Sequence, residues 1–175
     1  MPRGFLRACG LAIVMVVAAG CGGDDAALPR VSLIGDAVAA VAADIGVNDP
    51  ELFEVLADLD GVTVTVAETE VNMDTGEITA RYARSYRYDG ELLQGPGDPV
   101  AAEGAVFVGS AIPTLSNAVF GGVRDALDTP DVVDLAVSGG PDGSVIVDLT
   151  VRSERGGEIL VLVRPDGTVL GVQAD

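Results

Sequence analysis

The chain has 175 residues, with 10 basic side chains against 27 acidic ones and no histidine, which gives a formal charge of −17. A protein this acidic repels nucleic acid, so nucleic-acid binding is excluded. The lack of histidine removes the usual general base of hydrolases and the commonest zinc ligand. We therefore expect no cofactor, no metal site and no catalytic residues.

The first 20 residues have the three parts of an export signal. Arg3 and Arg7 precede an apolar run from Leu11 to Ala19, and a small residue then leads to Cys21. A helix rises about 1.5 Å per residue, so this run is far shorter than the roughly 30 Å of a bilayer's hydrocarbon core. We expect residues 1–20 to be cleaved and not to span the membrane.

The end of this signal, Val17-Ala-Ala-Gly-Cys21, resembles the bacterial lipobox, in which a cysteine after small residues receives diacylglycerol on its sulfur. The resemblance implies that Cys21 is the lipidated first residue of a protein anchored to the extracytoplasmic face of the cell membrane. Loss of Arg3 and Arg7 would change the formal charge from −17 to −19. The alternative is a soluble secreted protein in which Cys21 is an ordinary small residue.

Composition divides the mature chain into a tether and two units. Residues 21–30 are small and acidic without periodicity, which predicts a flexible tether after the lipidated cysteine. Residues 31–94 and 101–175 are expected to be two α+β units of one domain. A glycine- and proline-rich linker at 95–100 separates them.

Helices are predicted at three places. From Ser32 the apolar residues recur at spacings of three and four, which predicts a helix that ends at Gly46. A second short helix is expected to begin at Asp49-Pro50, because aspartate is a good N-cap and proline fits the first helical position. A third is expected over residues 112–127, with Pro113 near its start.

Strands are predicted where the apolar period changes to two. Alternation from Val62, a turn over residues 72–76 and renewed alternation from Ile78 indicate a hairpin, and residues 86–93 are expected to add a third strand through an Asp89-Gly90 turn. Four more strands follow in the second unit, at 132–137, 145–151, 159–163 and 169–172.

The predicted fold is α+β, with helices packed on an antiparallel sheet. The two halves suggest a duplicated unit of one helix and three strands, because a shift of 67 residues superposes Gly76 on Gly143 and Gly90 on Gly157. Chance alignment of glycine-containing hairpins is the alternative. The second unit, which ends in the run from Gly157 to Leu170, resembles PepSY-type or cystatin-like modules, which implies a helix before an antiparallel sheet and no catalytic motif.

One strand concentrates aromatic and cationic side chains. Period-two geometry puts Tyr82, Arg84, Tyr86 and Tyr88 on one face and Arg81 on the other. Such a cluster in an acidic domain is a candidate site for a carboxylate, phosphate or sugar ligand. The alternative is structural, because tyrosine favours strands and the arginines can neutralise acids on neighbouring strands.

Two sets of acids are candidates for catalytic pairs or calcium ligands. They are Asp58, Asp60, Asp74 and Glu77, and Asp125, Asp128, Asp131 and Asp134. Neither set has the spacing of a calcium-binding loop, and both fall where turns and helix ends favour aspartate. Solvated turn residues are the favoured interpretation.

Three functions remain. The leading one is a non-enzymatic envelope lipoprotein that binds an envelope protein or a small ligand, with its membrane contact through the lipid on Cys21. The second is a carrier of a lipid or other amphiphile in an apolar cavity. The third, a hydrolase that uses carboxylates alone, is disfavoured because the chain has no tryptophan to stack on a sugar.

Overall fold

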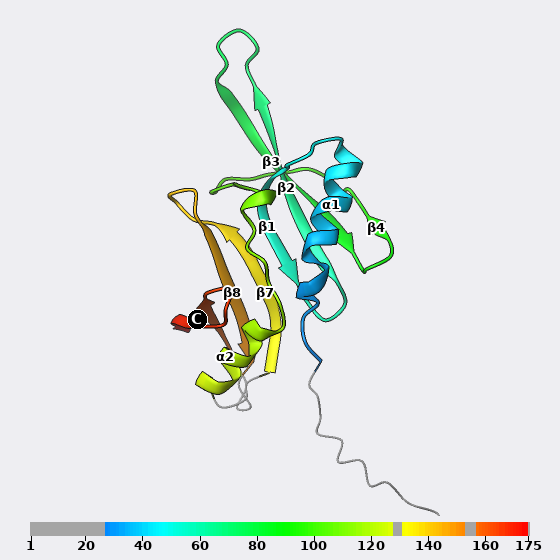
Figure 1. Cartoon of the computed structure of the whole chain (residues 1–175). Coiled ribbons are helices and arrows are strands. Elements are labelled where there is room, and N and C mark those ends of the chain that lie inside the picture. Colours follow the sequence, from blue (N-terminus) through cyan, green and yellow to red (C-terminus); the bar gives the residue numbers. More distant parts are fainter. Residues whose placement is uncertain (1–26, 128–130, 153–156, 175) are drawn as a thin grey trace, which may run out of the picture.

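The structure is a computed structural model that describes residues 27–127, 131–152 and 157–174 (Figure 1). The predicted signal over residues 1–20, the lipidation site at Cys21 and most of the predicted tether lie outside the described residues. Among the residues described, no helix is long and apolar enough to cross a bilayer.

A single antiparallel sheet forms the body of the domain. Its main path has the order β10-β9-β8-β7-β1-β2-β3-β4, with β5 beside β3 and β6 beside β1. The strands are β1 (Glu51–Ala57), β2 (Val62–Val71), β3 (Ile78–Tyr88), β4 (Leu93–Gln94), β5 (Val100–Ala101), β6 (Phe107–Val108), β7 (Asp131–Gly139), β8 (Val145–Arg152), β9 (Glu158–Val163) and β10 (Val169–Ala174). This arrangement, with two helices, confirms the predicted α+β class.

The helices α1 (Ile34–Ile45) and α2 (Ala118–Leu127) pack on one face of the sheet. Val55, Val137 and Val147 are paired across β1, β7 and β8, so their side chains share that face. All three are buried in the same apolar cluster as Val41 of α1 and Phe120 of α2. The core is therefore one continuous layer between the helices and the sheet.

The first helix agrees with the sequence prediction. A 3-10 turn, η1 (Val31–Leu33), leads into α1, and Ile34, Ala37 and Val41 form its buried stripe. Gly46 ends the helix with a φ of 71°, and its N–H donates to the carbonyl of Ala42. This left-handed conformation costs glycine little, which is why glycine is common at this position.

The predicted second helix at Asp49-Pro50 is wrong, because residues 51–57 form β1. β1 is central, paired with β2 on one side and with β6 and β7 on the other. Its pairing buries Leu52, Val55 and Ala57. Pairing on both edges thus overrides the local helix-start signal of Asp49-Pro50.

The predicted helix over residues 112–127 begins later than expected, at Ala118. Ile112 is extended, with φ −64° and ψ 123°, as expected for a residue that precedes a proline. The preceding residues form a 3-10 turn, η2 (Gly109–Ala111). The N–H of Val119 donates to the carbonyl of Ser116 at 3.0 Å, so the helical turn starts only after Pro113 has been passed.

The long hairpin of β2 and β3 and the strands β7 to β10 confirm the predicted strands. The third strand predicted over residues 86–93 is wrong, because β3 continues through Tyr88 and only Leu93–Gln94 form β4. The Asp89 carboxylate turns the chain by accepting the N–H groups of Glu91 at 2.9 Å and Leu92 at 2.8 Å. Residues 95–101 then run along β3, where the Gly97 N–H donates to Ser85.

The strand order is symmetric about the pair β7 and β1. Four strands of the main path follow α1 in sequence on one side, and four follow α2 on the other. The two halves meet where Val55 of β1 pairs with Val137 of β7. The sheet therefore crosses from one predicted unit to the other without a break.

Arg30 fixes the start of the described chain to one end of the sheet. Its backbone N–H donates to Asp58 at 2.9 Å, and its guanidinium donates to the carbonyls of Leu59 at 3.1 Å and Asp89 at 3.0 Å. Pro29 beside it is buried. The chain is thus held in place from Pro29 onward.

Candidate functional site

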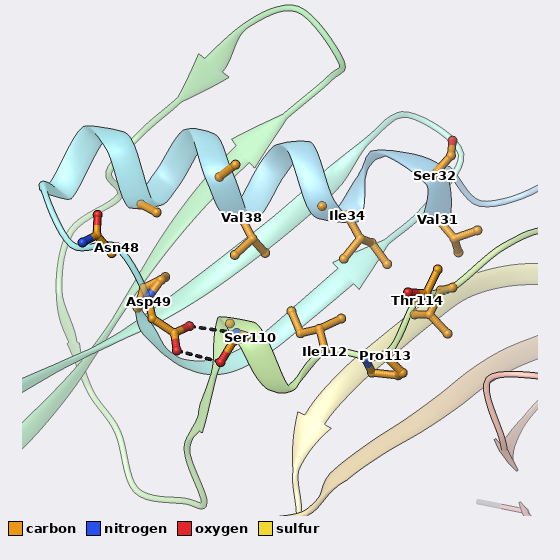
Figure 2. A pocket seen from close by; sticks show the side chains of 16 residues that line it. Val31, Ser32, Ile34, Val38, Asn48, Asp49, Ser110, Ile112, Pro113 and Thr114 are labelled. Carbon is orange, nitrogen blue, oxygen red and sulfur yellow. Dashed lines mark hydrogen bonds between the residues drawn. The ribbon is translucent and has the colours of Figure 1, made fainter.

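An apolar groove of about 580 Å³ runs along α1 (Figure 2). One wall is α1 with η1, and the other is the segment from Gly109 to Leu115. We call this hollow the α1 groove. Its apolar lining residues are Val31, Ile34, Gly35, Val38, Ala39, Ala42, Pro50, Gly109, Ile112, Pro113 and Leu115. Three other hollows on the surface measure about 370, 360 and 300 Å³.

Small residues of α1 make room for the groove. Gly35 and Ala39 lie on its exposed side, so they leave space where longer side chains would fill the hollow. The opposite wall is held close by Gly109, whose N–H donates to the carbonyl of Pro50 at 3.0 Å. A Cβ on Gly109 would lie 3.0 Å from Cγ1 of Val38, so a larger residue there would push this wall away from α1.

The polar groups that line the groove lie at its two ends. In Figure 2, Asn48, Asp49 and Ser110 lie at one end, and Ser32 and Thr114 lie at the other. Ser110 donates to Asp49 twice, through its N–H to Oδ1 at 2.8 Å and through its hydroxyl to Oδ2 at 2.7 Å. These bonds tie η2 to the chain that follows α1 and hold the Asp49 carboxylate in place.

A second feature lies on the sheet face opposite the helices. Glu54, Asp134 and Asp148, here called the acidic cluster, lie on β1, β7 and β8. Asp134, Ala136 and Ser138 of β7 point to this face. Asp148 of β8 pairs with Ala136, and Glu54 of β1 pairs with Ser138. Asp134 and Asp148 are therefore diagonal neighbours, whereas Glu54 lies on β1, across β7 from Asp148.

Desolvation raises the pKa of every member of the acidic cluster. Burial, followed by repulsion from Glu54 and Asp134, raises the pKa of Asp148 to about 6. Burial also raises the pKa of Asp134, although its hydrogen bonds to Thr150 oppose the shift. The pKa of Glu54 rises through partial desolvation and the charge of Asp134. Within the described residues, no salt bridge neutralises any of the three.

The structure separates the tyrosines and arginines predicted as a binding site. Tyr86 is 4% exposed in the core, where desolvation raises the pKa of its hydroxyl, and Tyr88 donates its hydroxyl to Gly90 at 3.0 Å. Tyr82 and Arg84 line one hollow, and Arg84 lies 2.9 Å from Glu68. Arg81 lines a different hollow, beside Ala102 and Glu103.

The predicted acid sets do not come together as a site in the part of the chain that is described. Asp58 accepts the N–H groups of Asp60 and Gly61 at 2.8 and 3.1 Å, which is a turn role. Asp128 lies outside the described residues. Among residues 27–127, 131–152 and 157–174, no group of three or more acids, cysteines or histidines could hold a metal ion.

Sequence reasoning missed both the α1 groove and the acidic cluster. The groove joins α1 to a segment far along the chain, and no periodic pattern links the two. The cluster left a faint signal, because Asp148 interrupts the apolar run from Val145 to Val151 on the face opposite the core. The acidic cluster could be recognised only from the pairing of β1, β7 and β8.

Comparison of the chain with protein-family models, curated proteins and solved structures gives no match.

Proposed function

We propose that the protein is a membrane-anchored extracytoplasmic lipoprotein whose domain binds a ligand in the α1 groove without enzymatic turnover. The groove itself carries the proposal. Its volume of about 580 Å³ falls within the range of roughly 300–1,000 Å³ typical of small-ligand sites. Its apolar walls with polar groups at the ends are also the usual composition of such sites.

The proposed anchor would hold the groove close to the membrane. Val31 lines one end of the groove and follows Cys21 by ten residues. An extended chain spans at most about 3.5 Å per residue, so this end lies within roughly 35 Å of the lipid proposed on Cys21. A ligand drawn from the bilayer surface would have a short path to the groove.

A binding role is favoured over hydrolysis because of the side chains present. The chain has neither histidine nor lysine to activate the hydroxyl of Ser110. The acidic cluster has raised pKa values, but Glu54, Asp134 and Asp148 line none of the four hollows described above. None of these four hollows therefore offers the cluster as the acid and base of a carboxylate-only hydrolase.

Carriage of a lipid or other amphiphile is the second candidate. The apolar walls of the α1 groove favour a ligand with a hydrocarbon chain. The groove lies beside α1, and its lining residues Gly35 and Ala39 are exposed, so a chain could enter it from the surface. A carrier would bind its ligand as proposed above and would also release it to a second membrane or protein.

The binding proposal is tested with an uncharged fluorescent dye, N-phenyl-1-naphthylamine, and the mature chain carrying Cys21→Ser. We expect the dye to bind, and Ala39→Phe to weaken binding by at least about tenfold, because the ring would occupy the groove. Ala43→Phe is the matched control, since Ala43 is exposed on the same helix and does not line the groove. Equal dye binding by the two variants, or no binding by the parent chain, would refute the proposal.

We also propose that the two halves derive from a duplicated unit of one helix and several strands. The symmetric order of strands around β7 and β1 supports it. The shift of 67 residues aligns β2 with β7, whereas the symmetry of the strand order makes β1 the counterpart of β7. The sequence alignment and the strand order therefore pair different strands of the two halves. Separate production of residues 27–101 and 102–175 tests whether each half retains a fold: a true duplicated unit should give two ordered fragments or a complex of the two.

A further inference from the structure

The two ends of the α1 groove differ in charge. Asp49 is the one ionisable side chain among the described residues that line it, and no arginine takes part. Asp49 follows the C-terminus of α1, where the helix dipole places partial negative charge. The whole chain is strongly acidic as well. The Asp49 end of the groove is therefore negative, whereas the Val31 end has only hydroxyl groups.

The Asp49 carboxylate keeps capacity for further hydrogen bonds. A carboxylate offers about four acceptor sites on its two oxygens. Ser110 takes one on each oxygen, at 2.8 and 2.7 Å, and fixes the group at the mouth of the groove. The free sites suit donors such as hydroxyl or ammonium groups. A carboxylate or phosphate ligand would be repelled by the same oxygens.

We infer that the α1 groove holds the hydrocarbon chain of an amphiphile that has no negative charge, with its head group against Asp49 and its chain directed towards Val31. This inference rests on the proposed function and names the ligand class. The apolar walls extend along α1 from Val31 to Ala42, a length of roughly 16 Å at 1.5 Å per residue. A single extended hydrocarbon chain fits such a length.

Charge selectivity gives the test. The mature chain with Cys21→Ser is loaded with N-phenyl-1-naphthylamine, which is then displaced at pH 8 and low salt by monolauroylglycerol, dodecylamine or laurate below their micelle concentrations. These probes have similar chains and differ in charge. We expect the first two to displace the dye and laurate to bind at least about tenfold more weakly than monolauroylglycerol, because the like charges of laurate and Asp49 repel at close range and are little screened at low salt.

Two matched variants assign the selectivity. Asp49→Asn should reduce the difference between laurate and monolauroylglycerol to about threefold or less, while Asp44→Asn should leave it near the parent value. Asp44 is an exposed acid at the same end of α1 that does not line the groove. Comparable unfolding transitions would show that both variants fold.

The outcomes separate the two proposals. Laurate binding as tight as monolauroylglycerol binding, or an equal response to both variants, would overturn the charge selectivity and leave the groove as a ligand site. Failure of all three amphiphiles to displace the dye would overturn the ligand class. Failure of the dye itself to bind, or equal dye binding by Ala39→Phe and Ala43→Phe, would instead contradict the proposed function.

Discussion

The guanidinium of Arg87 on β3 extends across β2 and hydrogen-bonds the carboxylate of Asp58, the residue that follows β1. Its two terminal nitrogens donate to Oδ2 at 2.8 Å and to Oδ1 at 2.6 Å, and Nη1 also donates to Thr63 of β2 at 3.0 Å. A planar guanidinium matches a carboxylate in this two-bond geometry, which lysine cannot reproduce. Three neighbouring segments are thereby joined by one side chain.

Loss of this pair should destabilise the fold. We expect Arg87→Gln to lower the free energy of unfolding by about 1–2 kcal/mol, measured by urea denaturation at pH 7. Arg152→Gln is the control, expected to cost less than about 0.5 kcal/mol, because the Arg152–Glu158 pair is 55% and 50% exposed against 30% and 33% for Arg87 and Asp58. Equal losses in the two variants would contradict this ranking.

The same pair should lose its contribution in acid. The hydrogen bond from Arg87 is the main reason that the pKa of Asp58 lies below its usual value of 3.8. A carboxyl whose pKa is lowered by folding stabilises the protein above its unfolded pKa and loses that effect as the pH falls through its folded pKa. The destabilisation by Arg87→Gln should therefore shrink below about pH 4.

The charge of Asp148 should lower the stability of the fold at neutral pH, whereas the charge of Asp58 raises it. Its pKa is raised to about 6 in the folded protein, so the folded state binds more protons than the unfolded state between about pH 4 and 6. Its charge thus destabilises the fold fully above about pH 6 and not at all below about pH 4. Asp148→Asn should raise the free energy of unfolding at pH 7.5 by roughly 1 kcal/mol, a value reduced for its partial exposure to solvent.

The pH dependence identifies the cause of that gain. Urea denaturation at pH 7.5 and pH 4.5 should show a clear gain for Asp148→Asn at the higher pH and a much smaller one at the lower. Asp142→Asn provides the comparison, because hydrogen bonds involving Ser144 lower the pKa of Asp142. That variant should give no gain at pH 7.5. A stabilisation by Asp148→Asn that is the same at both pH values would point to packing and not to charge.

Two adjacent glycines of α2 should respond in opposite ways to alanine. A Cβ on Gly122 would lie 2.2 Å from the carbonyl oxygen of Gly167, whereas a Cβ on Gly121 would meet nothing within 4 Å. We expect Gly122→Ala to cost roughly 2–3 kcal/mol, because α2 must move away from the turn between β9 and β10. Gly121→Ala should instead stabilise by about 0.5–1 kcal/mol. Denaturation curves in which Gly122→Ala is tolerated would show that this contact is loose.

The proposed membrane anchor has a test of its own. Cys21→Ser should move the protein from the membrane fraction to the soluble extracytoplasmic fraction and remove the mass of the lipid, because two or more acyl chains hold a protein stably. Cys9→Ser should remain anchored, since Cys9 lies within the predicted signal. Intact-mass measurement and fractionation decide the matter. A Cys21→Ser variant that remains in the membrane with the parent's mass would disprove lipidation.

The sequence predicted those elements whose apolar pattern is local and strong. α1 and the strands with alternating valines, such as β2, were found because one buried face is enough to produce the pattern. β1 was misread because Asp49-Pro50 looks like a helix start, and only its pairing with β2 and β7 shows that it is a strand. Local signals do not report contacts between distant segments.

The candidate site was beyond such reasoning for the same reason. The α1 groove needs Val38 and Ile112 to face each other, although they lie far apart in the chain. The predicted tyrosine and arginine cluster had the correct alternation, since Tyr86 and Tyr88 do share a face with Tyr82. The pattern could not show that this face is buried at Tyr86 and more open at Tyr82.

The central pairing of β1 with β7 also constrains when the chain can fold. In a chain that is synthesised from its N-terminus, β1 is made long before β7, so the pairing of Val55 with Val137 forms late. Until then β1 has a free edge in the middle of an unfinished core, and closing so long a loop is slow. The sheet can therefore be completed only after the second half of the chain has become available.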